Sequence, residues 1–320
     1  MANHDGNGWV RCALGHRHWG RYGAAGLLAY VVGGPGGPSG PGGAGGPGGP
    51  SGPGGADGRS VLLQRRSWWG HYGGTWGLPG GARDSHETAI AAALREAAEE
   101  CGVPPQAVRV EGIFDDDHGG WSYQTVIAMA ATEFDVHPAS EETLDVAWVA
   151  AADVPSLDLH PGLAAYWEVL AAELEPLTII VDAANVMGSR PDGWWRDRAG
   201  AARRLRDELA PLADTGLTAL PAGAEGTADS ALALWLPDIV LVVEGAARPA
   251  ALDNGAAAAG PRRLEVVAAP GSGDDTIAGL AGRLPGRRIV VTADRELRGR
   301  CTAAGASVAG PGWLLGLLRQ

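Results

Sequence analysis

A helix-like segment at residues 86–101 restricts the fold of this chain more than any other feature. At the spacing of an α-helix it has an apolar stripe, formed by Ile90, Ala93, Leu94, Ala97 and Cys101. The adjoining face carries three glutamates, Glu96, Glu99 and Glu100. Like charges at this separation repel one another unless cations lie among them. The segment therefore predicts a helix that buries one face and binds divalent cations with the next.

The three carboxylates predict a site for Mg²⁺ or Mn²⁺, because hard oxygen ligands of this charge density suit these ions. The preceding pair Gly80-Gly81 permits close approach of the backbone, and its carbonyls are further candidate ligands. An acidic helix face that is merely solvated is the alternative interpretation of such a run. The fixed spacing of glycine, arginine and glutamate favours the metal site.

The chain resembles the Nudix hydrolase family at residues 76–103, which read WGLPGGARDSHETAIAAALREAAEECGV. The matching positions are Gly81, Glu87, Arg95, Glu96, Glu99, Glu100, Gly102 and Val103. Small Ala97 stands at the first aliphatic position of the family's box, and Val103 fills the second. The match runs through the box without a gap, which makes the resemblance specific.

The resemblance implies a Nudix α/β/α sandwich with a mixed sheet over residues 1–175. It also implies hydrolysis of a nucleoside diphosphate linked to another group. Metal ions would be held by the carboxylates of Glu96, Glu99 and Glu100, together with the carbonyl of Gly80. The substrate stays open among dNTPs, oxidised nucleotides, ADP-ribose, NADH, sugar nucleotides and capped RNA ends. The alternative is a Nudix module that senses a nucleotide and regulates the second half of the chain.

Further roles follow from the same resemblance. Arg95 is expected to orient the glutamates by charge-assisted hydrogen bonds, together with Glu87. The general base is expected to be a glutamate of the box or of a distant loop, for which Glu141 and Glu142 are candidates. Four tryptophans could stack on a base, although such residues are more often part of a core: Trp68, Trp69, Trp76 and Trp121.

The segment CALGHRH places Cys12, His16 and His18 close together near the N-terminus. Zinc uses such ligands, but only three occur locally and no Cys-x-x-Cys partner follows. The segment therefore predicts a loop or a degenerate ribbon. The other cysteines, Cys101 and Cys301, are far from Cys12 in the sequence, so no disulfide framework is expected.

A glycine- and proline-rich run separates two strand-like segments of the first half. It repeats GPGGPSGPGGA from residue 34 onward, with glycine at every third position up to residue 58. The period is that of collagen, but the run is short and lies between AAGLLAYVV (24–32) and SVLLQRR (60–66). Because glycine and proline bury little apolar area, we predict a disordered loop over residues 33–58.

From residue 177 the pattern changes to alternating strands and helices, which predicts a parallel sheet covered by helices over residues 176–320. Strands are expected at 177–183, 239–245, 263–269 and 288–294, and helices near 197–213, 275–284 and 295–304. In the first half, further strands are expected at 108–114, 121–131 and 145–150, and a further helix near 162–174.

Acidic side chains follow the strands of this second half. Asp182, Glu244 and Asp294 stand at the ends of strands, and the pair Asp274 and Asp275 opens a helix. The carboxyl ends of parallel strands meet along one edge, so these groups should converge. Converging carboxylates predict divalent metal ions and two-metal hydrolysis of a phosphodiester. The alternative is that Asp274 and Asp294 are only helix N-caps.

The second half resembles the NYN/PIN-like endoribonuclease superfamily, which has a Rossmann-like parallel sheet. The carrying segments are IIVDAANVMGS (179–189), VVEGAARP (242–249), GSGDDTIAG (271–279) and VVTADREL (290–297). The resemblance implies a metal-dependent RNase, with Asn185 positioning the substrate or a metal-bound water. Glu244 departs from the aspartate that family members often have there.

A net charge of −12 and a pI near 5.1 exclude a global basic field that would gather nucleic acid non-specifically. Any contact with RNA must therefore come from local arginines of the second half. No apolar run reaches the length of about 18 residues needed to cross a bilayer, and the N-terminal residues lack a signal core. A cytoplasmic protein with a nucleotide substrate and no membrane partner is expected.

Overall fold

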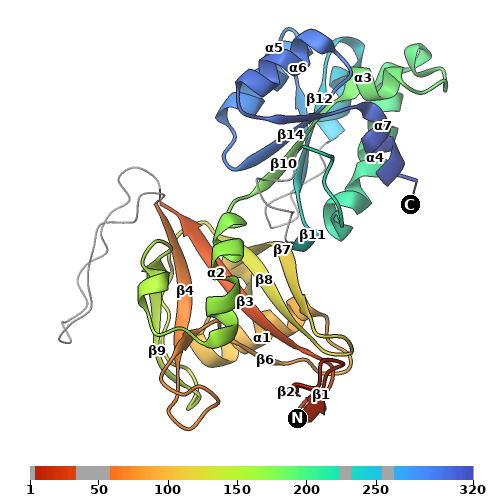
Figure 1. The fold of residues 1–320 in the computed structure, drawn as a ribbon. Coiled ribbons are helices and arrows are strands. Elements are labelled where there is room, and N and C mark those ends of the chain that lie inside the picture. Colours follow the sequence, from red (N-terminus) through yellow and green to blue (C-terminus); the bar gives the residue numbers. More distant parts are fainter. Residues whose placement is uncertain (1–3, 34–57, 224–231, 254–262, 320) are drawn as a thin grey trace. The chain divides into compact units, whose positions relative to one another are not determined.

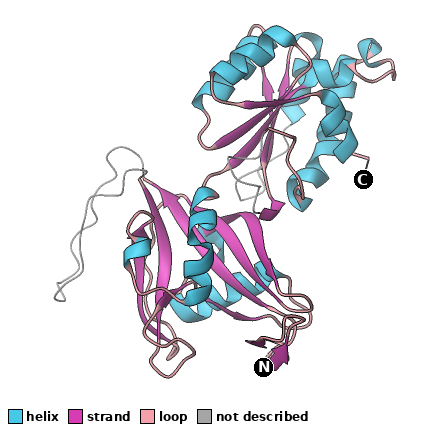
Figure 2. Cartoon of the chain, viewed as in Figure 1, coloured by secondary structure: helices cyan, strands magenta, loops and turns pink. Residues whose placement is uncertain are grey.

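The computed structural model describes residues 4–33, 58–223, 232–253 and 263–319. The chain forms two compact units, Met1–Leu174 and Glu175–Gln320. Figure 1 labels their helices and strands, and Figure 2 distinguishes the two kinds of element by colour. Residues 34–57, which make up nearly all of the loop that the sequence predicts to be disordered, lie outside the described residues.

The first unit is built on one mixed sheet. Its strands are β3 (Ala24–Val32), β4 (Arg59–Arg66), β5 (Trp76–Gly77), β6 (Gly80–Ala82), β7 (Val108–Asp117), β8 (Ser122–Ala130) and β9 (Thr143–Ala150). Within the unit, neighbours follow the order β7-β8-β3-β4-β5, with β6 paired to β3 and β9 paired to β4. β3 runs parallel to β8 and antiparallel to β4 and β6, which confirms the mixed sheet. β3 is buried over almost its whole length, because its sequence is apolar on both faces.

Two helices cover opposite faces of this sheet, α1 (Ala89–Cys101) and α2 (Pro161–Ala172) (Figure 1). Neighbouring residues of β7 mark the two layers, since successive side chains of a strand point to opposite faces. Ile113 packs against the core around α1, whereas Phe114 contacts Tyr166 of α2 with ring centroids 5.0 Å apart. The resulting three layers confirm the α/β/α sandwich. Short 3-10 turns lie at Pro105–Ala107 and Val154–Ser156.

A two-stranded hairpin precedes the sheet and was not expected from the sequence. Its strands are β1 (Trp9–Arg11) and β2 (Arg17–Trp19). The backbone N–H of Ala13, in the turn of the hairpin, donates to the carbonyl of Gly119 in the β7–β8 loop over 2.8 Å. The N–H of Gly6 donates to the carboxylate of Asp84, in the loop before α1, over 2.8 Å. The N-terminal segment is thus tied to two loops of the first unit.

The second unit contains the predicted parallel sheet. Its strands are β10 (Leu177–Asp182), β12 (Asp238–Val243), β13 (Leu264–Ala268), β14 (Arg287–Val291) and β15 (Ser307–Ala309). They lie in the order β13-β12-β10-β14-β15, and every adjacent pair is parallel. The chain therefore extends the sheet on one side of β10 and later on the other side. In such sheets, ligands bind at the carboxyl ends of the strands beside this reversal, here between β10 and β14.

The helices of this unit are α3 (Ala183–Gly188), α4 (Arg198–Thr215), α5 (Gly273–Arg283), α6 (Arg295–Ala303) and α7 (Pro311–Leu317). The helices predicted from the sequence lie within two residues of α4, α5 and α6 at each end, whereas α3 and α7 were not predicted. Further 3-10 turns lie at Trp194–Arg196 and Gly245–Asp253. In β11 (Leu232–Trp235), Trp235 forms an isolated antiparallel bridge with Leu217.

One face of the parallel sheet packs against α5 and α6 in an apolar core. This core contains Ile180, Val240, Val242, Ile277, Leu280, Val290, Leu297 and Cys301. Throughout the described parts of both units, no helix combines the length and the apolar composition that crossing a membrane requires.

Candidate functional site

Helix α1 carries most of the predicted site, and its two ends have clear local causes. The hydroxyl of Thr88 accepts a hydrogen bond from the N–H of Ala91 over 3.1 Å and caps the first turn. Gly102 ends the helix with a φ of 69°, a conformation that glycine adopts at little cost. The helix therefore begins at Ala89, later than the predicted residue 86, because the Thr88 cap sets its start.

The predicted apolar stripe of α1 faces the core. Ala93, Ala97 and Cys101 are fully buried, and Ile90 and Leu94 pack against the same cluster while partly exposed. The three glutamates differ in burial: Glu100 is buried, Glu96 is half-buried, and the side chain of Glu99 is 52% exposed. The helix thus presents its carboxylates as a graded series from the core to the surface.

Arg95 joins the carboxylates of this region. Its Nε and Nη2 lie 2.8 and 2.9 Å from the two oxygens of Glu87, in a two-point contact. Its Nη1 donates to Glu96 over 2.9 Å and to Glu99 over 3.2 Å, and its Nη2 also reaches the carbonyl of Ala82. The hydrogen bonds from Arg95 lower the pKa of Glu87. The guanidinium of Arg95 therefore holds one carboxylate of the loop and two of the helix in place.

Glu100 is fixed from the sheet. Its Oε2 accepts hydrogen bonds from the Nε2 of Gln64 over 2.9 Å and from the N–H of Gly80 over 2.8 Å. Burial raises the pKa of Glu100 to about 7, although the hydrogen bond from Gly80 acts in the opposite direction. Burial also raises the pKa of Glu96, with Arg95 opposing. In both cases burial raises the pKa by more than the neighbouring hydrogen-bond donors lower it.

Gln64 was not identified from the sequence. It is buried in β4, where its Nε2 also reaches the carbonyl of Leu78 over 3.3 Å. Its Oε1 accepts a hydrogen bond from the hydroxyl of Thr143 over 2.8 Å, and the thiol of Cys101 lies 3.8 Å away. The only signal in the sequence was an amide within the apolar strand SVLLQRR. A buried amide with all its groups engaged is a rigid support for Glu100.

Two glycines bring the backbone of β6 against this site. A Cβ at Gly81 would lie 2.6 Å from Oε1 of Glu96, and a Cβ at Gly80 would lie 2.4 Å from the carbonyl oxygen of Ala25. Gly81 is therefore required by the carboxylate, and Gly80 by the pairing of β6 with β3. The contact made by Gly80 with Glu100 uses its N–H, and the role of its carbonyl as a metal ligand stays a prediction.

The donor set fits a hard divalent cation. In the described part of the chain, both hydrogen bonds to Glu100 end on Oε2, so Oε1 is available to a cation. The pKa values of Glu96 and Glu100 are raised although Arg95 pairs with Glu96, so the positive charge nearby does not offset burial, and Mg²⁺ or Mn²⁺ would add to it. Glu141 and Glu142 are the two loop candidates for a general base. The negative charge of Glu142 contributes to the raised pKa of Glu96. Both Glu141 and Glu142 are exposed.

The four candidate tryptophans have separate environments. Trp68 and Trp69 are 69% and 68% exposed, so the core interpretation is wrong for both. Trp76 lies in β5 and is half-buried. Trp121 stacks on the ring of His18, with centroids 3.9 Å apart, and its indole N–H donates to the carbonyl of Gly20. Trp121 therefore belongs to the N-terminal hairpin region.

In the second unit, Asp182 ends β10 and caps α3. Its Oδ1 accepts from the N–H of Asn185 over 3.0 Å, and its Oδ2 accepts from the Nδ2 of Asn185 over 2.6 Å. The hydroxyl of Thr292, a buried residue not identified from the sequence, donates to the same Oδ2 over 2.9 Å. These residues span β10 and the end of β14, so the site lies where the strand order reverses.

Three of the predicted acidic residues lie close enough to a fourth, Asp274, for their charges to act on it. Burial, followed by the charges of Asp182, Asp294 and Glu244, raises the pKa of Asp274. Glu244 is oriented by the N–H of Gly273, which donates to its Oε2 over 2.7 Å. Asp182, Glu244 and Asp294 thus lie near Asp274, and their joint role as a metal site stays a prediction.

The N-cap interpretation holds for Asp294 and is wrong for Asp274. Asp294 accepts from the N–H of Leu297 over 2.8 Å at the start of α6. Asp274 lies inside the first turn of α5, whose N-cap position is Ser272. Asp275, the fifth predicted residue, pairs instead with Arg300 over 2.7 Å.

The comparisons with known proteins agree with the geometry of the first unit. A family model described as NUDIX domain matches residues 54–171. A Mycobacterium tuberculosis protein named "Putative 8-oxo-dGTP diphosphatase 3" is 42% identical over 175 residues, covering 52% of this chain and 69% of its own length. A Bifidobacterium longum nucleoside triphosphate pyrophosphatase/Nudix hydrolase fusion protein is 35% identical over 176 residues, covering 54% of this chain and 32% of its own length.

Among solved structures, a Nudix hydrolase from M. smegmatis, RenU, is similar to this chain with 41% sequence identity and a TM-score of 0.41. The similarity covers 52% of this chain and 92% of that one. The family is shown by the M. tuberculosis relative, which is 42% identical and covered over 69% of its length, together with the matched residues 54–171. This chain belongs to the Nudix hydrolase family.

Proposed function

We propose that the first unit hydrolyses a phosphoanhydride bond in a nucleoside diphosphate linked to another group, with Mg²⁺ or Mn²⁺ as cofactor. The observation that carries this proposal is the contact of Arg95 with Glu87, Glu96 and Glu99. It fixes carboxylates on one face of α1, beside Glu100, which Gln64 and Gly80 hold from the sheet.

The residues that would hold the metal are Glu96, Glu99 and Glu100, with the carbonyl of Gly80. Such an ion, when bound, polarises phosphate oxygens and makes water a stronger nucleophile. The chain's own groups prepare this site: Arg95 prevents the carboxylates from separating, and Gly81 leaves room for Glu96. Glu142 is the preferred general base, because its charge acts on Glu96, and Glu141 is the alternative.

For the substrate, we infer an oxidised purine nucleoside triphosphate. The support is the similarity to the M. tuberculosis protein, whose name assigns it 8-oxo-dGTP, at 42% identity. Hydrolysis of such a substrate between its α- and β-phosphates adds one water and releases the nucleoside monophosphate and pyrophosphate. The exposed rings of Trp68 and Trp69 could stack on the purine.

The experiment measures monophosphate release by the full chain from 8-oxo-dGTP, dGTP and ADP-ribose in the presence of Mg²⁺. We expect turnover of 8-oxo-dGTP to exceed that of dGTP, and Glu100→Gln to reduce turnover about 100-fold. Glu133→Gln, which changes an exposed glutamate outside α1, should retain turnover. Unchanged turnover in Glu100→Gln would remove the proposed mechanism. Binding of 8-oxo-dGTP without turnover by the wild type would favour a nucleotide sensor instead.

For the second unit, we propose a PIN-like, metal-dependent RNase. The supporting observation is the position of Asp182 at the carboxyl end of β10 and of Asp294 shortly after β14, on either side of the reversal in strand order. Asp274 and Glu244 add charge to this edge. Two divalent ions held there would stabilise the attacking and leaving oxygens of a phosphodiester, and Asn185 would position the substrate.

Cleavage of single-stranded RNA with Mn²⁺ tests this second proposal. We expect Asp182→Asn to abolish cleavage, because Asp182 is the most buried of the carboxylates at this edge. Asp207→Asn, which alters an exposed pair with Arg206 on α4, is the matched control and should cleave normally. Equal cleavage by the wild type and Asp182→Asn would show that the nuclease activity lies elsewhere.

A further inference from the structure

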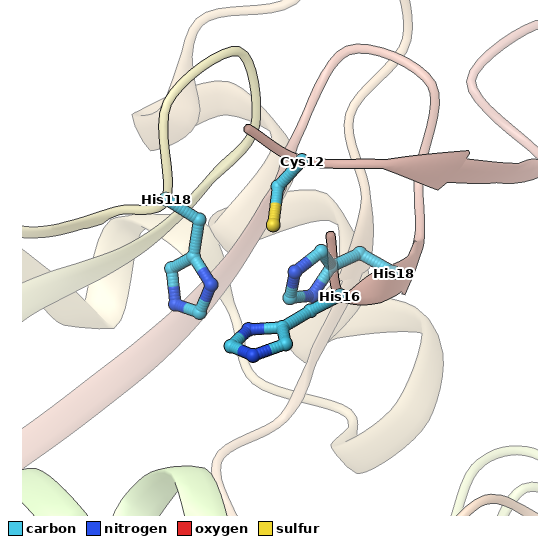
Figure 3. A group of neighbouring side chains, drawn as sticks. All are labelled: Cys12, His16, His18 and His118. Carbon is cyan, nitrogen blue, oxygen red and sulfur yellow. The ribbon is translucent and has the colours of Figure 1, made fainter. Parts of the chain in front are cut away.

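A cysteine and three histidines gather outside the carboxylate site of the first unit. Cys12, His16 and His18 come from the hairpin β1–β2, and His118 comes from the loop after β7. Each offers one ligand atom, and these four atoms all lie within 4.8 Å of one another. Figure 3 shows the sulfur of Cys12 and the three imidazole rings around a common space.

Two imidazole nitrogens of this group are buried without a hydrogen-bond partner in the described residues, Nε2 of His18 and Nδ1 of His118. Buried polar atoms are nearly always paired, so orphaned nitrogens call for a ligand. Cys12 is buried beside them as a free thiol. A soft cation would satisfy the sulfur and the nitrogens together.

The other nitrogen of His118 has the partner that metal-bound histidines usually have. Nε2 of His118 lies 3.1 Å from Oδ2 of Asp116, and the hydroxyl of Tyr166 donates to Oδ1 of Asp116 over 2.7 Å. A carboxylate at this position fixes the tautomer that carries its proton on Nε2 and leaves Nδ1 free to bind a metal. The unpaired Nδ1 and the Nε2 held by Asp116 both indicate that His118 would bind a metal through Nδ1.

The hairpin also holds its three ligands in place. The N–H of Cys12 donates to the carbonyl of His16 over 3.1 Å, which closes the turn between them. The ring of His18 is stacked on Trp121, and the N–H of Ala13 donates to Gly119 beside His118. The two loops are therefore positioned by contacts that do not involve the four ligand atoms.

We propose that Cys12, His16, His18 and His118 form a structural Zn²⁺ site. Zinc prefers four tetrahedral nitrogen and sulfur ligands, and a site with four protein ligands leaves no position for substrate. At zinc's usual bond lengths, tetrahedral ligand atoms lie about 3.3–3.8 Å apart, so a shift of about 1 Å completes the site. His118 is the fourth candidate ligand beside the three found locally in the sequence, and the segment expected as a loop or degenerate ribbon is a β-hairpin.

This ion would join the N-terminal segment to the β7–β8 loop. The same segment supports the loop before α1, because Gly6 donates to Asp84 and the carbonyl of Gly23 accepts from the N–H of Arg83 over 3.1 Å. Loss of zinc should therefore loosen both contacts, without removing any carboxylate of α1. The proposal does not depend on the proposed function.

The test is the zinc content of the full chain after loading with Zn²⁺ and dialysis against a weak chelator, measured by mass spectrometry of the metal. We expect one zinc per chain in the wild type and in Glu100→Gln, which separates this site from the carboxylates of α1. His16→Ala and His118→Ala should lose it, and His137→Ala, a substitution of an exposed histidine outside the group, should retain it.

Cobalt substitution adds a spectroscopic readout. Tetrahedral Co²⁺ with one thiolate ligand has visible absorption and a sulfur-to-cobalt charge-transfer band, and Cys12→Ser should lose the latter. Because His16 is exposed, His16→Ala should fold even if Cys12→Ser does not, and circular dichroism checks both. Absence of bound zinc in the wild type, or a full equivalent of zinc in folded His16→Ala and His118→Ala, would overturn the proposal.

Discussion

Arg95 donates two parallel hydrogen bonds, 2.8 and 2.9 Å long, to the carboxylate of Glu87, and its Nη1 donates to Glu96 over 2.9 Å. A residue from the loop before α1 and a residue from its second turn thus share one guanidinium. The planar fork sets the relative position of the two carboxylates, which a point charge could not do.

Arg95→Lys keeps the charge but removes the fork. We expect kcat/KM for nucleotide hydrolysis to fall about 10–100-fold, as for other groups that orient metal ligands, while the circular dichroism spectrum stays unchanged. Arg190→Lys is the matched control, because Arg190 makes a similar two-point contact with Glu208 in the second unit. Equal losses in the two variants, or none in Arg95→Lys, would contradict the assigned role.

Gly81→Ala and Gly80→Ala should separate activity from stability. The new Cβ at position 81 would press on the flexible end of Glu96. We therefore expect a folded protein that binds Mg²⁺ more weakly. The new Cβ at position 80 would meet the backbone of Ala25, so β6 could not pair with β3 and the Tm should fall. Magnesium titration of activity and thermal unfolding of both variants check this. Identical behaviour of the two variants would refute the distinction.

His160 should make the first unit less stable in acid. Its Nδ1 accepts from the N–H of Gly162 at the start of α2, and burial, followed by the charges of Arg66 and His71, lowers its pKa to about 4. Between the unfolded pKa of 6.5 and about 4, the unfolded chain binds the proton first, so the free energy of unfolding falls as the pH falls.

The loss attributable to His160 is up to about 3 kcal/mol. His160→Asn keeps a capping oxygen without a titration, so its unfolding free energy should decline less over the same pH range. Calorimetric melting of the first unit from about pH 7 to about pH 4 measures this, with His137→Asn as the control. A parallel decline in the wild type and His160→Asn would exclude His160 as the cause.

Asp274→Asn should stabilise the second unit in the absence of metal. It removes a carboxylate whose pKa is raised by burial and, after that, by the charges of Asp182, Asp294 and Glu244. We expect a higher Tm without metal and a smaller rise in Tm on addition of Mn²⁺. Asp275→Asn changes the adjacent residue, which pairs with Arg300 at an exposed position. It should change neither the Tm without metal nor the rise in Tm on addition of Mn²⁺. A larger Mn²⁺ effect in Asp274→Asn than in the wild type would oppose a shared metal site.

The features readable from the sequence were those that are local. Strand β3 matches the predicted range 24–32, because its apolar run is continuous, and α1 ends as predicted because Gly102 follows it. The contact of Arg95 with Glu87 was expected because a box motif implies it.

The features that could not be predicted from the sequence depend on contacts between distant segments. Gln64 supports Glu100 across 36 positions and Thr292 supports Asp182 across 110, and no spacing rule connects such pairs. His118 lies in a turn far along the chain from Cys12, so the group of four could not be counted from CALGHRH alone. Three-residue strands such as β1 and β6 escaped because so short a run has no readable period.

The chain leaves β3 at Gly33 and returns to β4 at Gly58, and the N–H of Gly33 donates to the carbonyl of Gly58 over 2.5 Å. That contact closes the sheet beneath whatever lies between the two glycines. Val32 and Arg59 pair just inside this contact, so the register of β3 and β4 is held by residues of the strands themselves. An insertion between Gly33 and Gly58 that keeps both glycines should therefore preserve the pairing of β3 with β4.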